Sequence, residues 1–347
     1  MKYNKFYSTN EELIYDIDIH KYINNSTNIY EPFYGNGDLL KTLISNDEYK
    51  TLIINDITVI DDKQICYKNV NILNIDSLLS CLWGNTEHNF IITNPPYTSK
   101  NKLSLKIKNK YKELFVNGVD DLYLIFINQL INYPVDGGFI IIPSNFIFGK
   151  RNKLFIKFMK IYNINVLNIY EKKIFEKTTQ SVISLLFTNN NINNIHTKIY
   201  IHNNDNSITT LSNKTFNKII NYNINDWLPL DENNDIVISR SYNKPTDLTH
   251  THIRISLLDY NMKAYYTDTL IIDKETDRAF MSVCINKNLT EEEQHKIIQL
   301  FNETLNDLRN KTHSLIFTSY REFDRKRLSF SEAIHILKYT INKLYIE

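Results

Sequence analysis

Short apolar runs alternate with helical patterns through the first half of the chain. Strands are expected at residues 28–30, 51–54, 70–75, 90–93, 139–142, 166–170 and 182–187, and helices at 38–44 and 122–131. Continuous apolar strands separated by helices are typical of a mainly parallel sheet that is covered on both faces. The pattern therefore predicts an α/β fold, in which ligands bind beyond the carboxyl ends of the strands.

The second half of the chain has a different pattern. Residues 189–235 are polar and rich in Asn, which favours a domain boundary near residue 190. Residues 265–273 and 278–285 resemble the two strands of a hairpin around residues 274–277. Thr290 with Glu293, and Ser329 with Glu332, have capping-box spacing and predict helices that run to Leu308 and near Leu344. We expect residues 1–190 to form the α/β domain and residues 191–347 an α+β domain.

Composition and charge exclude several classes of protein. The chain has 347 residues, enough for about two domains, with 40 basic and 39 acidic side chains and a net charge of +1. This balance excludes a histone-like basic protein but leaves room for local basic patches. The sequence shows no apolar run long enough for a membrane span and no secretion signal, so an intracellular, cytoplasmic protein without a membrane partner is expected. The His and Cys residues show no metal-ligand spacing, and no metal is expected.

The tetrapeptide Asn94-Pro95-Pro96-Tyr97 directly follows an apolar strand. An exocyclic amine on an aromatic ring is a poor nucleophile, because its lone pair is delocalised. The Asn94 side-chain oxygen and the Pro95 carbonyl can accept its two hydrogens and direct the lone pair at a methyl donor. The prolines hold these acceptors rigid, and the Tyr97 ring offers a stacking surface for a base. The alternative is a rigid turn at the end of a strand.

A glycine-containing turn lies between the first strand and the first helix, at residues 31–37 (Glu-Pro-Phe-Tyr-Gly-Asn-Gly). Gly35 and Gly37 allow close approach of the backbone to a ligand. The turn lacks the ending of a phosphate-binding Walker loop and the third glycine of a dinucleotide fingerprint. Asp56 ends the second strand, where a carboxylate can accept both ribose hydroxyls, and Asp76 follows the third strand and could bind an adenine amine.

With these motifs in place, the chain resembles S-adenosylmethionine-dependent DNA methyltransferases of the adenine-N6 class. The resemblance covers about residues 5–187, with the gamma order of cofactor motif, catalytic motif and C-terminal recognition region, as in many type II restriction–modification systems. It implies a Rossmann-like methyltransferase domain and a C-terminal α+β target-recognition domain. The turn departs from the commoner Asp-Pro-small-Cys beginning, which leaves the roles of Phe33 and Tyr34 open.

The resemblance also assigns site residues. Residues 5–9 are similar to the segment that closes over the methionine part of the cofactor. Residues 174–175 and 179–182 are similar to the motif whose aromatic residue packs against the extruded base. The implied catalytic set is Asn94, Pro95, Pro96, Tyr97 and Phe175. The implied S-adenosylmethionine-binding set is Tyr7, Thr9, Glu31, Pro32, Phe33, Gly35, Gly37, Asp56, Asp76 and Asn94.

Two basic segments are candidates for contact with DNA. Arg321, Arg325, Lys326 and Arg327 precede a capped helix, in a chain that uses little Arg elsewhere, and Arg forks bind guanine edges and phosphates. Arg240, Arg254 and Arg278 are weaker candidates. Residues 100–112, which follow the tetrapeptide, hold many lysines and are equally compatible with a loop that contacts phosphates or with a solvated helix.

These observations predict a site-specific methyltransferase that acts on the N6 amine of an adenine flipped out of double-stranded DNA. A restriction endonuclease that cleaves the same site is an expected partner. Asn at position 94 favours adenine over cytosine. Two alternatives stay open: a methyltransferase for RNA bases or protein glutamine with the same tetrapeptide, and a DNA-binding subunit without catalytic activity.

Overall fold

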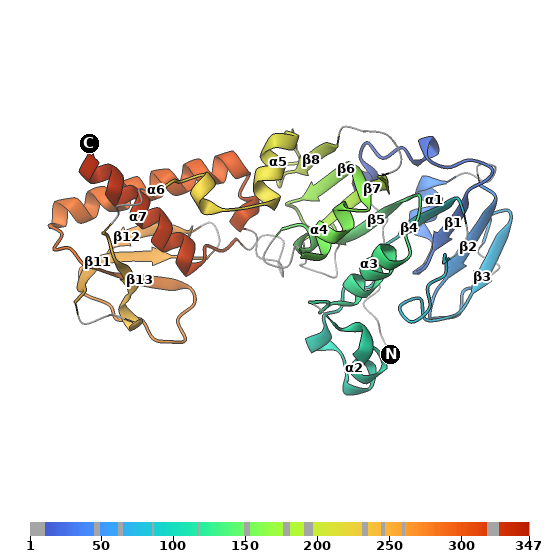
Figure 1. The fold of residues 1–347 in the computed structure, drawn as a ribbon, viewed down its shortest axis with the longest axis horizontal. Helices are drawn as coiled ribbons and strands as arrows, with labels where there is room; N and C mark the ends of the chain where they lie inside the picture. The colour runs from blue at the N-terminus through green and yellow to red at the C-terminus, as the bar shows by residue number, and fades with distance from the viewer. Residues whose placement is uncertain are drawn as a thin grey trace. The chain divides into compact units, whose positions relative to one another are not determined.

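The computed structural model describes residues 11–44, 49–61, 65–84, 87–116, 118–148, 153–175, 181–190, 197–230, 235–243, 247–258, 261–317 and 326–346. The chain forms two compact units (Figure 1). The first ends at Asn213 and the second begins at Lys214.

The first unit is built on a nine-stranded sheet with the order β3-β2-β1-β4-β5-β7-β6-β8-β9. Its strands are β1 (Asn28–Glu31), β2 (Thr51–Asn55), β3 (Val70–Leu73), β4 (Asn89–Thr93), β5 (Gly137–Pro143), β6 (Tyr162–Tyr170), β7 (Val182–Asn189), β8 (Lys198–His202) and β9 (Ile208–Thr210). Each strand predicted up to residue 187 is present, within four residues at its ends.

Most neighbouring strands in this sheet are parallel. The pairs β2–β3, β1–β2, β1–β4, β4–β5 and β6–β8 run parallel, whereas β7 runs antiparallel to both β5 and β6, and β9 to β8. Every residue of β4 and β5 is buried, as expected of central strands covered on both faces. The predicted α/β fold with a mainly parallel sheet is confirmed.

The helices of this unit are α1 (Asp38–Leu43), α2 (Leu105–Lys110), α3 (Leu122–Asn132) and α4 (Lys153–Met159), with short 3-10 turns at Glu11–Ile14, Ile19–Lys21, Lys100–Lys102, Lys112–Leu114 and Ser144–Phe146. Residues 122–127 and Leu130 of α3 are all buried, so this helix is enclosed on nearly every side. Helix α3 comes after β4 and the tetrapeptide in the chain, and it helps to fix the position of both. The segment that carries α2 extends beyond α3 in Figure 1.

The division between the units lies beyond the predicted boundary at residue 190. Strands β8 and β9 pair onto β6 and extend the first sheet to Thr210. Their apolar residues are few and surrounded by Asn, so the composition hides them. In β8 only Ile199, Ile201 and His202 are buried.

The second unit has a four-stranded antiparallel sheet with the order β10-β13-β11-β12. The strands are β10 (Ile238–Arg240), β11 (Thr249–Ser256), β12 (Lys263–Tyr266) and β13 (Phe280–Ile285). The predicted hairpin is wrong, because β12 and β13 do not pair with each other and β11 lies between them. The expected first strand at residues 265–273 ends at Tyr266.

Helices α6 (Glu291–Thr312) and α7 (Phe330–Ile346) pack on this unit's core, and α5 (Asn213–Ile220) precedes the sheet. Both predicted capping boxes are present: Glu293 N donates to Thr290 Oγ1 over 3.2 Å, and Glu332 N donates to Ser329 Oγ over 3.2 Å. The buried residues Ile297, Phe301, Leu305 and Leu308 follow one face of α6 at helical spacing. Short 3-10 turns lie at Ile224–Asp226, Ser241–Asn243 and Leu315–Phe317.

Within the described ranges, no helix combines the length and the apolar character that crossing a membrane requires.

Candidate functional site

The two sequence motifs meet where the strand order of the first sheet reverses. The order runs β3-β2-β1 in one direction and β4-β5 in the other, and β1 and β4 are parallel neighbours. The crevice outside the carboxyl ends at such a point is where open α/β sheets bind ligands. The glycine turn follows β1 and the tetrapeptide follows β4. Thr93 Oγ1 donates to Glu31 Oε1 over 2.5 Å and connects the two strand ends directly.

Glu31 is the buried carboxyl group of this site, with 2% of its surface exposed. Its Oε1 also accepts a hydrogen bond from the Phe33 backbone N–H over 3.1 Å. Burial raises the pKa of Glu31 from 4.5 to about 8, and the charge of Asp56 acts in the same direction, against the two hydrogen bonds. Glu31 is therefore largely protonated at neutral pH in this structure.

The glycine turn has the backbone conformation that its glycines predict. Gly35 has a φ of 59° and Gly37 a φ of 74°, both left-handed. A Cβ atom on Gly37 would lie 2.3 Å from the Tyr34 hydroxyl, whereas a Cβ atom on Gly35 would meet nothing closer than the Phe33 carbonyl at 4.0 Å. Residue 37 must therefore lack a side chain, because the Tyr34 ring fills that space. At Gly35 the backbone is uncovered, so a ligand can approach it closely.

The next strand holds this turn in place. Asn55, at the end of β2, donates from Nδ2 to the carbonyls of Pro32 (3.2 Å) and Ile75 (3.0 Å), and its own carbonyl accepts from Tyr34 N over 2.8 Å. Ser77 Oγ also donates to the Pro32 carbonyl, over 2.8 Å. Asn55, Ser77 and Thr93 are not among the site residues predicted from the sequence. Their position at or next to the carboxyl ends of predicted strands is the signal that could have identified them.

Asp56 lies beside the turn and is 8% exposed. Its Oδ2 accepts from Gly35 N over 2.9 Å, and its Oδ1 accepts from Thr58 N and Oγ1 over 2.8 and 2.6 Å. The carboxylate therefore positions the glycine turn. A carboxylate offers about four acceptor sites, so a ribose would share oxygens that already bind the loops.

Asp76 follows β3 by three residues, and its Oδ2 faces residues far along the chain. Tyr111 Oη donates to this oxygen over 2.8 Å, Lys110 Nζ forms an ion pair with it, and Leu78 N donates to Oδ1 over 3.1 Å. In this structure the carboxylate predicted to bind adenine is thus occupied by the segment that follows the tetrapeptide. Lys110 and Tyr111 were not among the predicted site residues.

The tetrapeptide is tightly packed. Tyr97 is 4% exposed, Pro95 is buried, and Asn94 and Pro96 are half-buried. Burial raises the pKa of the Tyr97 hydroxyl well above 10, so this hydroxyl stays protonated. It hydrogen-bonds Asn94 Oδ1 and the Ile141 carbonyl, the latter over 3.0 Å. The side-chain oxygen predicted to receive the substrate amine is therefore bound to Tyr97.

Aromatic rings surround Tyr97. Its ring centroid lies 6.5 Å from that of Phe175 and 6.3 Å from that of Tyr123, whose hydroxyl donates to Asn145 Oδ1 over 2.5 Å. The structure thus brings together Tyr97 and Phe175, which the sequence placed in one site. Phe33 contacts Phe126 of α3 at a centroid distance of 5.5 Å. Tyr7 and Thr9, together with residues 176–180, lie outside the described residues.

The C-terminal basic segment is only partly described, since Arg321 and Arg325 lie outside the described residues. Lys326 is 6% exposed, and Arg327 is exposed and donates from Nη2 to the Arg278 carbonyl over 3.5 Å. Burial removes Lys326 from any surface in this structure. The guanidinium of Arg240 binds the carbonyls of Lys274 and Asp277 and lies 4.0 Å from the Phe330 ring, so it has a structural role.

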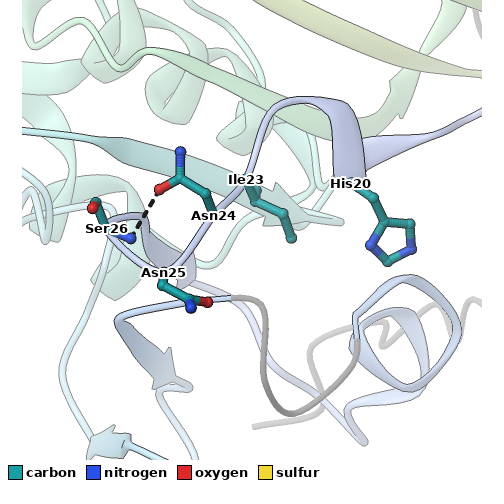
Figure 2. Close-up of a pocket in the computed structure, with 5 residues that line it drawn as sticks. All are labelled: His20, Ile23, Asn24, Asn25 and Ser26. Atoms are coloured by element: carbon teal, nitrogen blue, oxygen red, sulfur yellow. Dashed lines mark hydrogen bonds between the residues drawn. The ribbon is translucent and has the colours of Figure 1, made fainter.

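A surface hollow of about 430 Å³ lies elsewhere on the molecule, lined by His20, Ile23, Asn24, Asn25 and Ser26 (Figure 2). These residues precede β1, at the amino ends of the strands, and the hollow is therefore separate from the two motifs. Among the described residues, no group of three His, Cys, Asp or Glu side chains is placed to hold a metal ion.

The residues at the carboxyl ends fit S-adenosylmethionine. The left-handed turn with open space beside Gly35 and the acidic side chain after β2 suit a nucleoside carrying a polar amino-acid tail, whereas Asp76 after β3 is bound to Lys110 and Tyr111 in this structure. Glu31, Gly35 and Asp56 would hold it, and the bound cofactor supplies an activated methyl group.

Comparison with known proteins supports this chemistry. Residues 12–175 match the family model of the Eco57I restriction-modification methylase. No curated protein matches the chain.

Several solved structures are similar in part. The type I restriction-modification methyltransferase subunit from Streptococcus thermophilus has 14% identity and a TM-score of 0.41, over 64% of this chain and 53% of that one. The type IIG restriction endonuclease BpuSI has 14% identity and a TM-score of 0.44, over 69% and 36%. The chain thus spans about half of the first structure and about a third of the second.

The family match extends from the segment before β1 to Phe175 and includes both motifs. It confirms the predicted resemblance of this region to S-adenosylmethionine-dependent methyltransferases of restriction–modification type, with S-adenosylmethionine as the cofactor.

Proposed function

We propose that the protein is a DNA methyltransferase that transfers a methyl group to the N6 amine of adenine. The observation that carries this proposal is the placement of Asn94-Pro95-Pro96-Tyr97 at the carboxyl end of β4, beside the glycine turn of β1, with Thr93 bonded to Glu31 between them. A methyl donor bound at the glycine turn and a substrate amine bound to Asn94 would then meet at the adjoining carboxyl ends of β1 and β4.

The side chains have defined roles in this proposal. Asn94 Oδ1 and the Pro95 carbonyl accept the two amine hydrogens and draw the nitrogen toward tetrahedral geometry. The amine loses its proton after transfer, so no general base is required. The adenine leaves the helical stack to reach the site, because its amine is inaccessible within the duplex. Tyr97 is bonded to Asn94 through its hydroxyl, and the Phe175 ring lies 6.5 Å from the Tyr97 ring, so these two rings are the proposed aromatic contacts of the base.

The Tyr97–Asn94 hydrogen bond gives this site a closed state. In the proposed exchange, the amine takes the place of the Tyr97 hydroxyl at Asn94 Oδ1, and the hydroxyl keeps the Ile141 carbonyl as its acceptor, so base entry leaves no polar group unpaired. For the Tyr97 ring to stack on the base, it must first leave its buried position.

The family match, to a restriction-modification methylase, supports duplex DNA as the proposed substrate and a restriction endonuclease for the same site as the proposed partner. A solved type IIL enzyme, MmeI, was determined in complex with DNA, at 14% identity to this chain and a TM-score of 0.39 over 59% of this chain and 36% of that one. The second unit is proposed to select the site.

The test is to incubate the purified protein with labelled S-adenosylmethionine and duplex DNA, and to identify the methylated nucleoside after digestion. N6-methyladenine is the expected product, and single-molecule sequencing of DNA from expressing cells would give its sequence context. Label in cytosine would contradict the adenine assignment, and label only in RNA or protein would support an alternative substrate. S-adenosylmethionine binding without transfer to any of these would favour a silent subunit.

A further inference from the structure

The segment after the tetrapeptide, residues 100–116, is a folded projection, which we call the lysine arm. Its base is closed by backbone hydrogen bonds from Lys100 N to the Asp120 carbonyl (2.7 Å) and from Leu122 N to the Thr98 carbonyl (3.1 Å). The buried residues Ile107, Tyr111 and Phe115 give it a small core. The arm is therefore a folded segment and not an unstructured run of charged residues.

The charge of the arm is strongly positive. It contains six lysines, at positions 100, 102, 106, 108, 110 and 112, and one acidic residue, Glu113. The whole chain has a net charge of +1, so this concentration is local. Local surplus charge of one sign indicates a surface for a partner of the opposite sign.

Two of the lysines have contacts within the protein. Lys110 pairs with Asp76, and Lys100 lies 5.0 Å from the Phe115 ring centroid. Lys102, Lys106 and Lys112 are exposed, and across the described ranges no acidic side chain pairs with them. These three side chains can reach an external anion.

The arm is also fixed relative to the catalytic crevice. Its base is continuous with the tetrapeptide at one end and with α3 at the other, while Lys110 and Tyr111 attach it to the carboxyl end of β3 through Asp76. An anion bound by the arm would lie at the edge of the sheet where Asn94 is presented.

We propose that the lysine arm is a DNA-backbone contact of the catalytic unit itself, with Lys102, Lys106 and Lys112 binding phosphates beside the target base. This inference rests on the proposed function, since it requires duplex DNA at Asn94. Such contacts carry no sequence information and position the duplex for the site that the second unit would select.

The experiment measures binding of the full-length protein to a mixed-sequence duplex over a range of salt concentrations. The arm variant is K102Q/K106Q/K112Q. The matched control, K50Q/K157Q/K160Q, removes three exposed lysines that precede β2 and β6 at the amino ends of the strands. S-adenosylmethionine titration of both variants reports whether the first unit is folded, and K106Q alone provides a milder arm variant.

Each phosphate contact contributes about 0.9 to the slope of log affinity against log salt. The arm variant is expected to reduce this slope by about 2 to 3 and to weaken binding at low salt by roughly tenfold or more. The K106Q variant should reduce the slope by about 1, and the control should match the wild type. If the wild type methylates DNA and the arm variant, the control and the wild type have equal slopes, the arm proposal alone is overturned. A wild type that does not bind the duplex would overturn the proposed function as well. An arm effect seen with RNA and not with DNA would contradict DNA as the partner.

Discussion

The two loops at the adjacent carboxyl ends of β1 and β4 are held in different ways. The loop after β1 is held by carboxyl oxygens that accept from backbone amides: Glu31 accepts from Phe33, and Asp56 accepts from Gly35. In the loop after β4, the Asn94 side-chain oxygen is bonded to another side chain, the Tyr97 hydroxyl, which also bonds the Ile141 carbonyl. Backbone amides cannot leave without unfolding the turn, whereas a tyrosine hydroxyl can be exchanged by side-chain rotation. The comparison suggests a preformed cofactor side and a substrate side that opens.

The largest expected effect is on the substrate side. Asn94→Ala removes the proposed side-chain acceptor for the amine, and single-turnover methylation should fall by about 10²–10³-fold, the usual loss for one transition-state hydrogen-bonding group. The S-adenosylmethionine dissociation constant should stay close to that of the wild type. Asn94→Asp keeps an acceptor and should retain part of the rate. Near-normal turnover by Asn94→Ala would remove Asn94 from the catalytic set.

The next effect concerns Glu31 and stability. Its folded pKa of about 8 exceeds its ordinary value of 4.5, so its contribution to stability is fully present below about pH 4.5 and is lost as pH rises through about 8. Glu31→Gln keeps the carbonyl oxygen without the ionisation and should remove this loss, a difference on the order of a few kcal/mol between about pH 5 and pH 8. Urea unfolding of both proteins across this range measures it. Parallel stability curves would show that Glu31 ionises normally in the fold.

Cofactor affinity should respond to Asp56. Asp56→Ala removes the proposed acceptor for ribose hydroxyls and the bond from Gly35 N, and the S-adenosylmethionine dissociation constant should rise by about 10- to 100-fold, since hydrogen bonds to a charged group contribute about 1.5–3 kcal/mol. Thr58→Val is the control, because it replaces the hydroxyl that donates to Asp56 with a methyl group and leaves the carboxylate in place. If both variants weaken binding equally, Asp56 acts only by holding the loop; an unchanged constant in Asp56→Ala would exclude it from the site.

Sequence patterns predict the centre of this protein better than its margins. Strands β4 and β5 are continuous apolar runs that are buried along their whole length. The bounds predicted for these two strands lie within one or two residues of the observed ones. Strand β11 was missed because its sequence, Thr-His-Thr-His-Ile-Arg-Ile-Ser, alternates with few apolar residues. The false hairpin followed from this omission, since two strands with no third in view are most simply paired with each other.

The candidate site divides in the same way. Gly35, Gly37 and the tetrapeptide are recognisable locally, because their backbone requirements are written in consecutive residues. The contacts of Asp76 with Lys110 and Tyr111 join residues 34 and 35 positions apart, and no local pattern encodes them. The bond from Thr93 to Glu31 spans 62 positions for the same reason.

The smallest effect tests the exchangeable bond directly. Tyr97→Phe keeps the aromatic ring but removes the hydroxyl that binds Asn94 Oδ1 and the Ile141 carbonyl, so the protein should lose about 1 kcal/mol of stability. The methylation rate should stay within a few-fold of the wild type, because the substrate amine replaces the hydroxyl in the proposed complex. Tyr123→Phe, which removes the buried hydroxyl bond to Asn145, is the matched control. If Tyr97→Phe lost as much activity as Asn94→Ala while Tyr123→Phe did not, the hydroxyl would itself take part in the chemistry, and the substrate side would be as fixed as the cofactor side.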